Sequence, residues 1–341
     1  MMMKRKKRRE YDEIMISILA LVLMMAACSF AAAEGVQPSE GPVIGIAWRA
    51  DTDSEFFTNI CRAVEAAGGK WILLDQVRLP DLTYGEDGKL KEGVAETGAL
   101  DEMAAKYVRN NTWQESNAEE VVGNVSAVLF TGGEDISPSL YYQPEEWHGI
   151  EAERDYNAER DISDYLTMTY CLDNDIPVMG FCRGMQMLAV VSGGETIQDI
   201  PMFFEHQGEY LEHRNEKATP DAYRDYASHD VQLINGGIAR EIFGTDALYG
   251  CPSWHHQAVE SVDYTRLTIT GYTDTNGTRM IEILERSDKD IAIGFQFHPE
   301  AAVVKHLDHA ENEYDFMDYD TAIRPFIWLI EQVSIPLADA A

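Results

Sequence analysis

Short apolar runs alternate with stretches of helical periodicity along most of the chain. Continuous apolar runs are typical of buried strands, whereas apolar positions repeated every three or four residues indicate amphipathic helices. The runs that suit buried strands are residues 42–48, 70–74, 126–130 and 177–181. The stretches with helical spacing are residues 54–67, 99–108, 159–174 and a segment ending at Val191. This alternation predicts an α/β fold in which a mostly parallel sheet carries helices on both faces.

The remaining parts of the pattern are less regular. Residues 80–117 contain Pro80 and several glycines, and we interpret them as an insertion or a lid-like excursion that includes the helix near 99–108. Further alternating segments near 267–273, 279–284 and 291–297 precede a final helix over about 320–333. Strand signals therefore continue to about residue 297, before the final helix.

The N-terminus has the pattern of an export signal. Six basic residues at 4–9 precede an apolar stretch at 14–27 that is short for a membrane span. Ala31–Ala33 offers a cleavage site, and the residues before Cys28 resemble a lipoprotein box in which this cysteine would carry a lipid. An uncleaved anchor is the alternative. We expect an exported protein, secreted or lipid-anchored, with a signal at 1–33, a linker at 34–41 and a folded domain at 42–335.

Charge and cysteine content exclude several classes of partner. The formal net charge is −32 and the sequence pI is about 4.5, which excludes nucleic acid and anionic membrane surfaces as expected partners. Membrane contact is expected only through the N-terminal signal or a lipid on Cys28. The five cysteines form no Cys-x-x-Cys pair and are too sparse for a disulfide scaffold. We therefore expect no metal and no organic cofactor.

A candidate nucleophile follows the strand at 177–181. Cys182 is flanked by Gly180 and Gly184, and a sharp strand-to-helix turn needs small residues at such positions. A thiol at the N-terminus of the next helix is favoured in its thiolate form by backbone N–H groups and the helix dipole. The alternative is a small buried cysteine in an ordinary turn.

Two other strand ends carry matching chemistry. His298 follows the last predicted strand and can act as the base for a thiol, while Glu300 can orient its imidazole as the third member of a triad. After the strand at 126–130, the amide of Gly133 together with that of Arg183 would form an oxyanion hole. The alternative for the segment with His298 and Glu300 is a surface turn, and the alternative for the segment with Gly133 is an ordinary Gly-Gly turn.

These motifs, in this order, closely resemble the class I glutamine amidotransferase-like superfamily and, within it, the γ-glutamyl-γ-aminobutyrate hydrolase group of cysteine peptidases. The likeness covers about residues 42–335. The segments that carry it are 159–161, 180–186, 193–194, 198–200, 213–214, 228–229, 253–259 and 296–300.

The resemblance implies a flavodoxin-like sheet and hydrolysis of a γ-glutamyl amide through a thioester. It assigns Cys182 as nucleophile, His298 as base and Glu300 as the orienting group. The residues that it places against the glutamyl part of the substrate are Gln186, Arg214 and His255. For the arginine there is also a physical argument, because a guanidinium fork matches an α-carboxylate.

The chain departs from this group in ways that bear on the leaving amine. An export signal is unusual for an enzyme of this kind, the excursion at 80–117 is long, Asp164 stands where glutamate is common, and Phe297 replaces a frequent tryptophan. Two other functions stay open: a glutaminase domain that passes ammonia to a synthetase, and a non-catalytic binding protein of the same fold. The expected partners are a small γ-glutamyl substrate and, as an option, a second copy in a homodimer.

Overall fold

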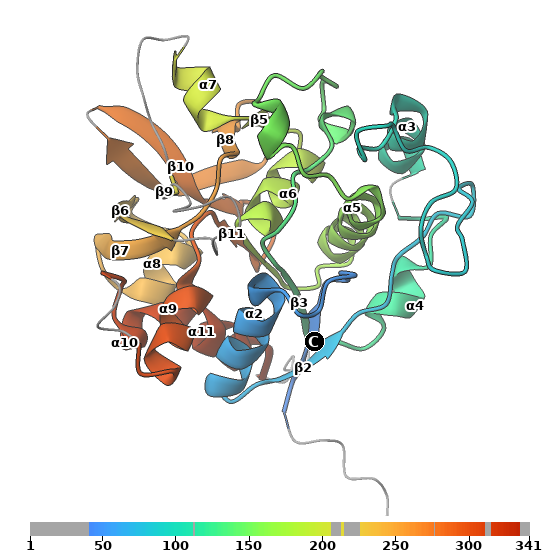
Figure 1. The fold of residues 1–341 in the computed structure, drawn as a ribbon. Coiled ribbons are helices and arrows are strands. Elements are labelled where there is room, and N and C mark those ends of the chain that lie inside the picture. Colours follow the sequence, from blue (N-terminus) through green and yellow to red (C-terminus); the bar gives the residue numbers. More distant parts are fainter. Residues whose placement is uncertain are drawn as a thin grey trace, which may run out of the picture. The chain divides into compact units, whose positions relative to one another are not determined.

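A large sheet organises the computed structural model, which describes residues 41–111, 113–205, 213–214, 226–275, 277–310 and 315–334. Within these residues the sheet has nine strands in the order β2-β1-β3-β4-β11-β10-β9-β6-β7 (Figure 1). The bounds are β1 (Val43–Ile46), β2 (Lys70–Leu73), β3 (Ala127–Phe130), β4 (Val178–Phe181), β6 (Ala227–Leu233), β7 (Ala247–Ser253), β9 (Leu267–Thr275), β10 (Thr278–Arg286) and β11 (Ala292–Phe295).

The first five strands of this order run parallel, and the last four continue the sheet in antiparallel pairs. The parallel half has the flavodoxin-like order 2-1-3-4-5, with β11 as the fifth strand. A separate pair joins β5 (Glu195–Ile197) to β8 (Ala258–Ser261). The predicted flavodoxin-like α/β fold is thus confirmed, although the sheet contains more antiparallel pairing than the sequence pattern indicated.

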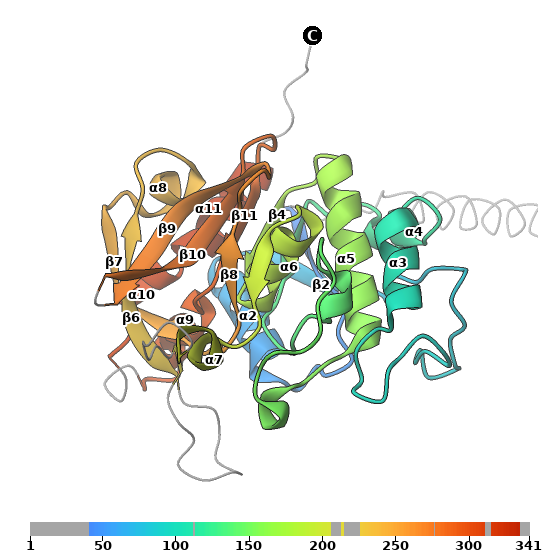
Figure 2. The same ribbon diagram turned by 90° about the horizontal axis from the view of Figure 1, so that it is seen from above.

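Helices cover both faces of the parallel half, and others pack beside the antiparallel strands. Their bounds are α2 (Glu55–Ala66), α3 (Glu102–Asn111), α4 (Ala118–Val122), α5 (Ala158–Asp173), α6 (Arg183–Val191), α7 (Ile200–Glu205), α8 (Ile238–Phe243), α9 (Pro299–Leu307), α10 (Tyr319–Ala322) and α11 (Arg324–Ser334). Side chains alternate along each strand. Ala127 and Leu129 therefore belong to the core cluster that also contains residues of α2, α8, α9 and α11, while Val128 and Phe130 belong to the cluster that contains residues of α3 to α6. Figure 2 shows α8 and the antiparallel strands on the side away from α3 to α5.

Two segments differ from the sequence prediction. The helix expected over 320–333 is divided at Ile323 into α10 and α11, and Pro325 lies in the first turn of the second, where a missing N–H costs no hydrogen bond. In the segment 80–117, Leu82, Leu100 and Val108 are buried in the core beside α5. This part of the chain forms a packed flank, and the lid interpretation is wrong.

The N-terminal predictions are outside the described part of the chain. The signal at 1–33 lies there entirely, and of the linker at 34–41 only Gly41 is described. The residues from Pro42 onward form one compact unit. Of the helices that the structure describes, none has both the length and the apolar composition needed to cross a bilayer.

Candidate active site

The three predicted catalytic segments meet at one edge of the sheet. Strands β3, β4 and β11 are parallel neighbours, with Phe130 opposite Gly180 and Phe181 opposite Phe295. The carboxyl ends of parallel strands lie at the same edge, where α/β proteins bind their ligands. The sheet register therefore brings together Cys182, which follows β4, and His298, which follows β11.

Cys182 occupies a strained backbone position. Its φ is 50° and its ψ is −107°, a conformation that is costly for a residue with a side chain. A Cβ on Gly180 would lie 2.5 Å from the backbone of Gly184, and a Cβ on Gly184 would lie 2.5 Å from the Phe130 carbonyl oxygen. The close approach of strand and helix thus requires glycine on both sides, as expected for a nucleophile elbow.

His298 and Glu300 form a buried pair beside this turn. The His298 Nδ1 atom lies 2.6 Å from Glu300 Oε1, and neither residue is exposed. Burial lowers the pKa of His298, but the negative charges of Glu300 and Cys182 outweigh it and raise the pKa to about 10. Nε2 makes no hydrogen bond of ordinary length within the described residues, although Cys182 is close enough to affect the pKa. This nitrogen is placed to exchange a proton with the thiol.

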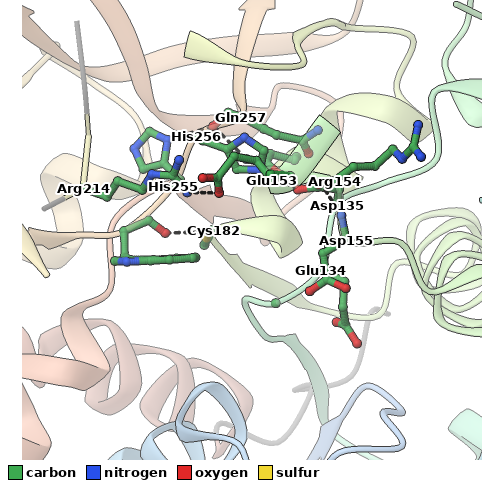
Figure 3. Close-up of a pocket in the computed structure, with 14 residues that line it drawn as sticks. Glu134, Asp135, Glu153, Arg154, Asp155, Cys182, Arg214, His255, His256 and Gln257 are labelled. Carbon is green, nitrogen blue, oxygen red and sulfur yellow. Dashed lines mark hydrogen bonds and ion pairs between the residues drawn. The ribbon is translucent and has the colours of Figure 1, made fainter. Parts of the chain in front are cut away.

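The Cys182 side chain faces a pocket (Figure 3). Only 6% of the residue is exposed, and Sγ lies 4.0 Å from the carbonyl oxygen of Trp254. On its other side, a Cβ on Gly132 would lie 2.8 Å from His298 Cε1 and 3.4 Å from Cys182 Cβ. The absence of a side chain at Gly132 leaves the space in which thiol and imidazole approach each other.

A buried arginine holds the loop that carries the predicted oxyanion donor Gly133. Arg160 Nη2 donates to the carbonyl oxygens of Thr131 and Gly132, at 2.9 and 3.0 Å, and its guanidinium also pairs with Glu134. Gly133 itself has a φ of 143° and lines the pocket. The sequence motif included Arg160 but did not indicate this role, because its partners lie on a different strand end.

The backbone and the side chain of Arg183 have different roles in the site. As the first residue of α6 it has an N–H without an intrahelical partner, which is available to an oxyanion. Its guanidinium is buried, 2.6 Å from Asp161 Oδ1, and is paired with Asp164. Asp164, which stands where glutamate is common in the group that the sequence resembles, therefore still forms an ion pair with Arg183.

The three predicted substrate residues all line the pocket. Arg214 Nη1 lies 2.9 Å from Glu153 Oε2, and its guanidinium lies 5.6 Å from the ring centre of Trp254. Gln186 Nε2 donates to the carbonyl of Gln257 at 3.1 Å. His255 Nδ1 lies 2.7 Å from the same carbonyl oxygen. The last two side chains are thus bound into the pocket wall, while Arg214 stands at its charged side.

His256 is a pocket residue whose role sequence reasoning missed. Its Nε2 lies 2.9 Å from Asp135 Oδ1 and its Nδ1 lies 3.3 Å from Asp199 Oδ2. Burial lowers the pKa of His256, but hydrogen bonds to both carboxylates raise it to about 9. The pocket lining therefore includes this protonated histidine as well as Arg154 and Arg214 (Figure 3). In the sequence, only the run His255-His256-Gln257 pointed to this histidine, and it did not indicate that Asp135 and Asp199 are its partners.

Comparisons with known proteins identify the family of the chain. A family model described as Peptidase C26 matches residues 107–300, which is more than half of the chain. The chain is 27% identical over 210 residues to Protein NtpR of Enterococcus hirae, a match that spans 61% of this chain and 78% of that protein. It is 26% identical over 183 residues to the gamma-glutamyl-gamma-aminobutyrate hydrolase PuuD of Escherichia coli (strain K12). That match spans 53% of this chain and 66% of the hydrolase, just under two thirds of its length.

A solved structure of similar extent is the glutaminase domain of Trypanosoma brucei CTPS with bound acivicin. It is 12% identical with a TM-score of 0.47, and the match covers 85% of this chain and 93% of that one. The family match, by contrast, includes both the Cys182 turn and the His298–Glu300 pair. The chain therefore belongs to the Peptidase C26 family and is a glutamine amidotransferase-like hydrolase.

Proposed function

We propose that the protein hydrolyses a γ-glutamyl amide, with Cys182 as nucleophile, His298 as general base and acid, and Glu300 as the group that orients the imidazole. The observation that carries this proposal is the position of Cys182, on a strained turn beside a buried His–Glu pair and facing a pocket. The match to a relative named gamma-glutamyl-gamma-aminobutyrate hydrolase supports the choice of substrate class.

The first half-reaction forms a thioester. The Cys182 thiol passes its proton to His298, and the thiolate attacks the γ-carbonyl carbon. A C–S bond forms, and the carbonyl oxygen becomes an oxyanion that the N–H groups of Gly133 and Arg183 stabilise. The His298 imidazolium then gives its proton to the leaving nitrogen through Nε2 as the C–N bond breaks. The products are a γ-glutamyl thioester on the enzyme and a free amine.

The second half-reaction releases glutamate. Water enters where the amine has left, and His298 removes its proton as the water oxygen attacks the thioester carbon. The C–S bond breaks and the sulfur leaves as thiolate, which restores the starting enzyme. Glu300, 2.6 Å from Nδ1, stabilises the imidazolium that is present before the first proton transfer and forms again when water is deprotonated, and it fixes the direction of the ring.

The charged side of the pocket suits the zwitterionic end of a glutamyl group. Arg214 offers a guanidinium for an α-carboxylate, and Glu153, 2.9 Å from Arg214, offers negative charge for an α-ammonium group. A γ-glutamyl group presents both charges on one carbon, so it could bind between these residues while its γ-carbonyl extends to Cys182. An amide substrate without an α-carboxylate and an α-ammonium group could not form these ion pairs.

Time-resolved mass spectrometry of the purified full chain tests the proposal. The substrates are γ-glutamyl-γ-aminobutyrate, γ-glutamyl dipeptides and glutamine, and the variant is Cys182→Ala. Cys61→Ala is the matched control, because Cys61 is a buried free cysteine in α2 whose pKa burial raises to about 12. Glutamate release by the wild type and the control, with loss in Cys182→Ala, is the expected result. Full activity of Cys182→Ala would contradict the mechanism, and turnover of glutamine alone would favour a glutaminase domain.

A further inference from the structure

Three histidines and a glutamate gather in the interior beside the catalytic pocket. They come from separate parts of the chain: His229 from β6, Glu282 from β10, and His213 and His255 from two segments that pair by an isolated bridge. One side-chain atom of each residue lies within 4.8 Å of the corresponding atoms of the other three. Only His255 of this cluster lines the pocket that contains Cys182.

The distances within the cluster approach those of a tetrahedral donor set. Glu282 Oε1 lies 3.4 Å from His213 Nδ1, 3.6 Å from His229 Nε2 and 4.0 Å from His255 Nε2. Tetrahedral zinc has bonds of about 2.0–2.1 Å to nitrogen and oxygen, so neighbouring donors stand roughly 3.3–3.4 Å apart. Small side-chain rotations would close the remaining gaps.

The interior around the cluster leaves its polar atoms poorly satisfied. Glu282 is fully buried, and neither of its carboxylate oxygens makes a hydrogen bond within the described residues. The same holds for Nε2 of His255 and for both ring nitrogens of His229. A buried carboxylate normally pairs with a cation or coordinates a metal. In the described part of the chain its ion-pair partners are these histidines.

The histidine on the pocket side is oriented as metal ligands usually are. His255 Nδ1 lies 2.7 Å from the Gln257 carbonyl oxygen and must donate its hydrogen there, which leaves the Nε2 lone pair directed to the cluster. Such a hydrogen bond from the second nitrogen is the common support of a metal-bound imidazole.

We propose that His213, His229, His255 and Glu282 bind one divalent transition-metal ion of the zinc type. Three imidazole nitrogens and one carboxylate oxygen form a donor set that zinc accepts in four-coordinate sites, and four protein ligands close the coordination shell. The role is therefore structural. The sequence-based expectation of no metal relied on the lack of paired cysteines, and these ligands are too widely spaced along the chain to form a recognisable motif.

The metal would fix the segment that carries a pocket residue. The carbonyl of His213 already accepts a hydrogen bond from the Ser253 hydroxyl at 2.7 Å. Arg214, the next residue, lines the pocket and pairs with Glu153. A metal bond to His213 would hold Arg214 toward the substrate. This consequence rests on the proposed function, whereas metal binding itself does not.

Metal content and a Co²⁺ spectrum of the full chain test the site. Tag-free wild type, His229→Gln and Glu282→Gln are compared with the control His148→Gln, an exposed histidine elsewhere. After incubation with Zn²⁺ and dialysis, about one zinc ion per chain is expected in the wild type and the control, and at least about tenfold weaker binding in the two variants. Co²⁺ should give the intense visible absorption of a tetrahedral site in the wild type, and a chelator should abolish it.

The outcomes separate the metal from a simple histidine–carboxylate cluster. No stoichiometric zinc in the wild type, or equal binding by all variants, would overturn the proposal. If a variant does not fold, as judged by its circular dichroism, the wild-type Co²⁺ spectrum decides, and an octahedral spectrum counts against the site. Hydrolysis that fails while zinc still binds would refute the proposed reaction and leave the metal site standing.

Discussion

Replacing His256 with glutamine should reduce the stability of the fold most strongly at neutral and acidic pH. His256 is buried and lies between Asp135 and Asp199, at 2.9 and 3.3 Å. Its pKa rises from the ordinary 6.5 to about 9 in the folded protein. A histidine with a raised pKa stabilises the fold fully below its unfolded pKa, and this contribution is lost as the pH rises through the folded pKa.

The size of the effect follows from the same pKa values. A rise from 6.5 to about 9 corresponds to roughly 3 kcal/mol of folding free energy, because one pKa unit is equivalent to about 1.4 kcal/mol. A typical domain is stable by only about 5–15 kcal/mol. The loss in His256→Gln is therefore a large fraction of the total, and the two aspartates would also lose the cation between them.

Urea denaturation of the full chain measures this contribution. The wild type, His256→Gln and the exposed control His148→Gln are unfolded at about pH 6 and again at about pH 10. The gap between wild type and His256→Gln should be about 3 kcal/mol at the lower pH and should close toward the higher pH. His298 also titrates near pH 10 but is present in every chain, so it cancels in the difference. A gap that stays constant with pH would refute the reasoning.

Two further changes test the geometry around the nucleophile. Glu300→Gln removes the negative charge 2.6 Å from His298, and this charge helps to raise the pKa of the imidazole. The value of kcat should therefore fall by about 100-fold, and the alkaline limb of the kcat/KM profile should move to lower pH. An unchanged profile would show that Glu300 does not control the imidazole. Gly132→Ala places a Cβ 2.8 Å from His298 Cε1, so it should displace the ring and lower kcat by about 100-fold. Steady-state kinetics measure the rate, and a thermal melt shows whether the variant is folded. A normal rate in a folded variant would contradict this prediction.

Much of the parallel half of the fold was predictable from local patterns. Each central strand is a continuous apolar run because helices cover both of its faces. The candidate catalytic residues follow within a few positions of the ends of β3, β4 and β11. Cys182, His298 and Gly133 could therefore be assigned to strand ends without knowledge of their contacts. Their catalytic roles stay predictions, although the sheet register does bring them together.

The antiparallel half gave a weaker signal. Strand β6 alternates more exposed and more buried positions, and β7 includes a glycine and a proline. Their pairing depends on neighbours that are distant along the chain, since β6 lies between β7 and β9. Strand propensity is set mainly by such tertiary neighbours. A pattern within one segment could not place these strands in the sheet.

What the sequence determined by itself was the fold class and the residues that stand at the ends of the parallel strands, because both follow from periodicity and from contiguous motifs. Only the tertiary structure decided how the charges are paired. Arg160 supports the Gly132–Gly133 loop, His256 becomes a cation between Asp135 and Asp199, and Glu282 meets its histidines in the interior. Burial and charge pairing join residues far apart along the chain, and they exist only after the sheet has brought those residues together.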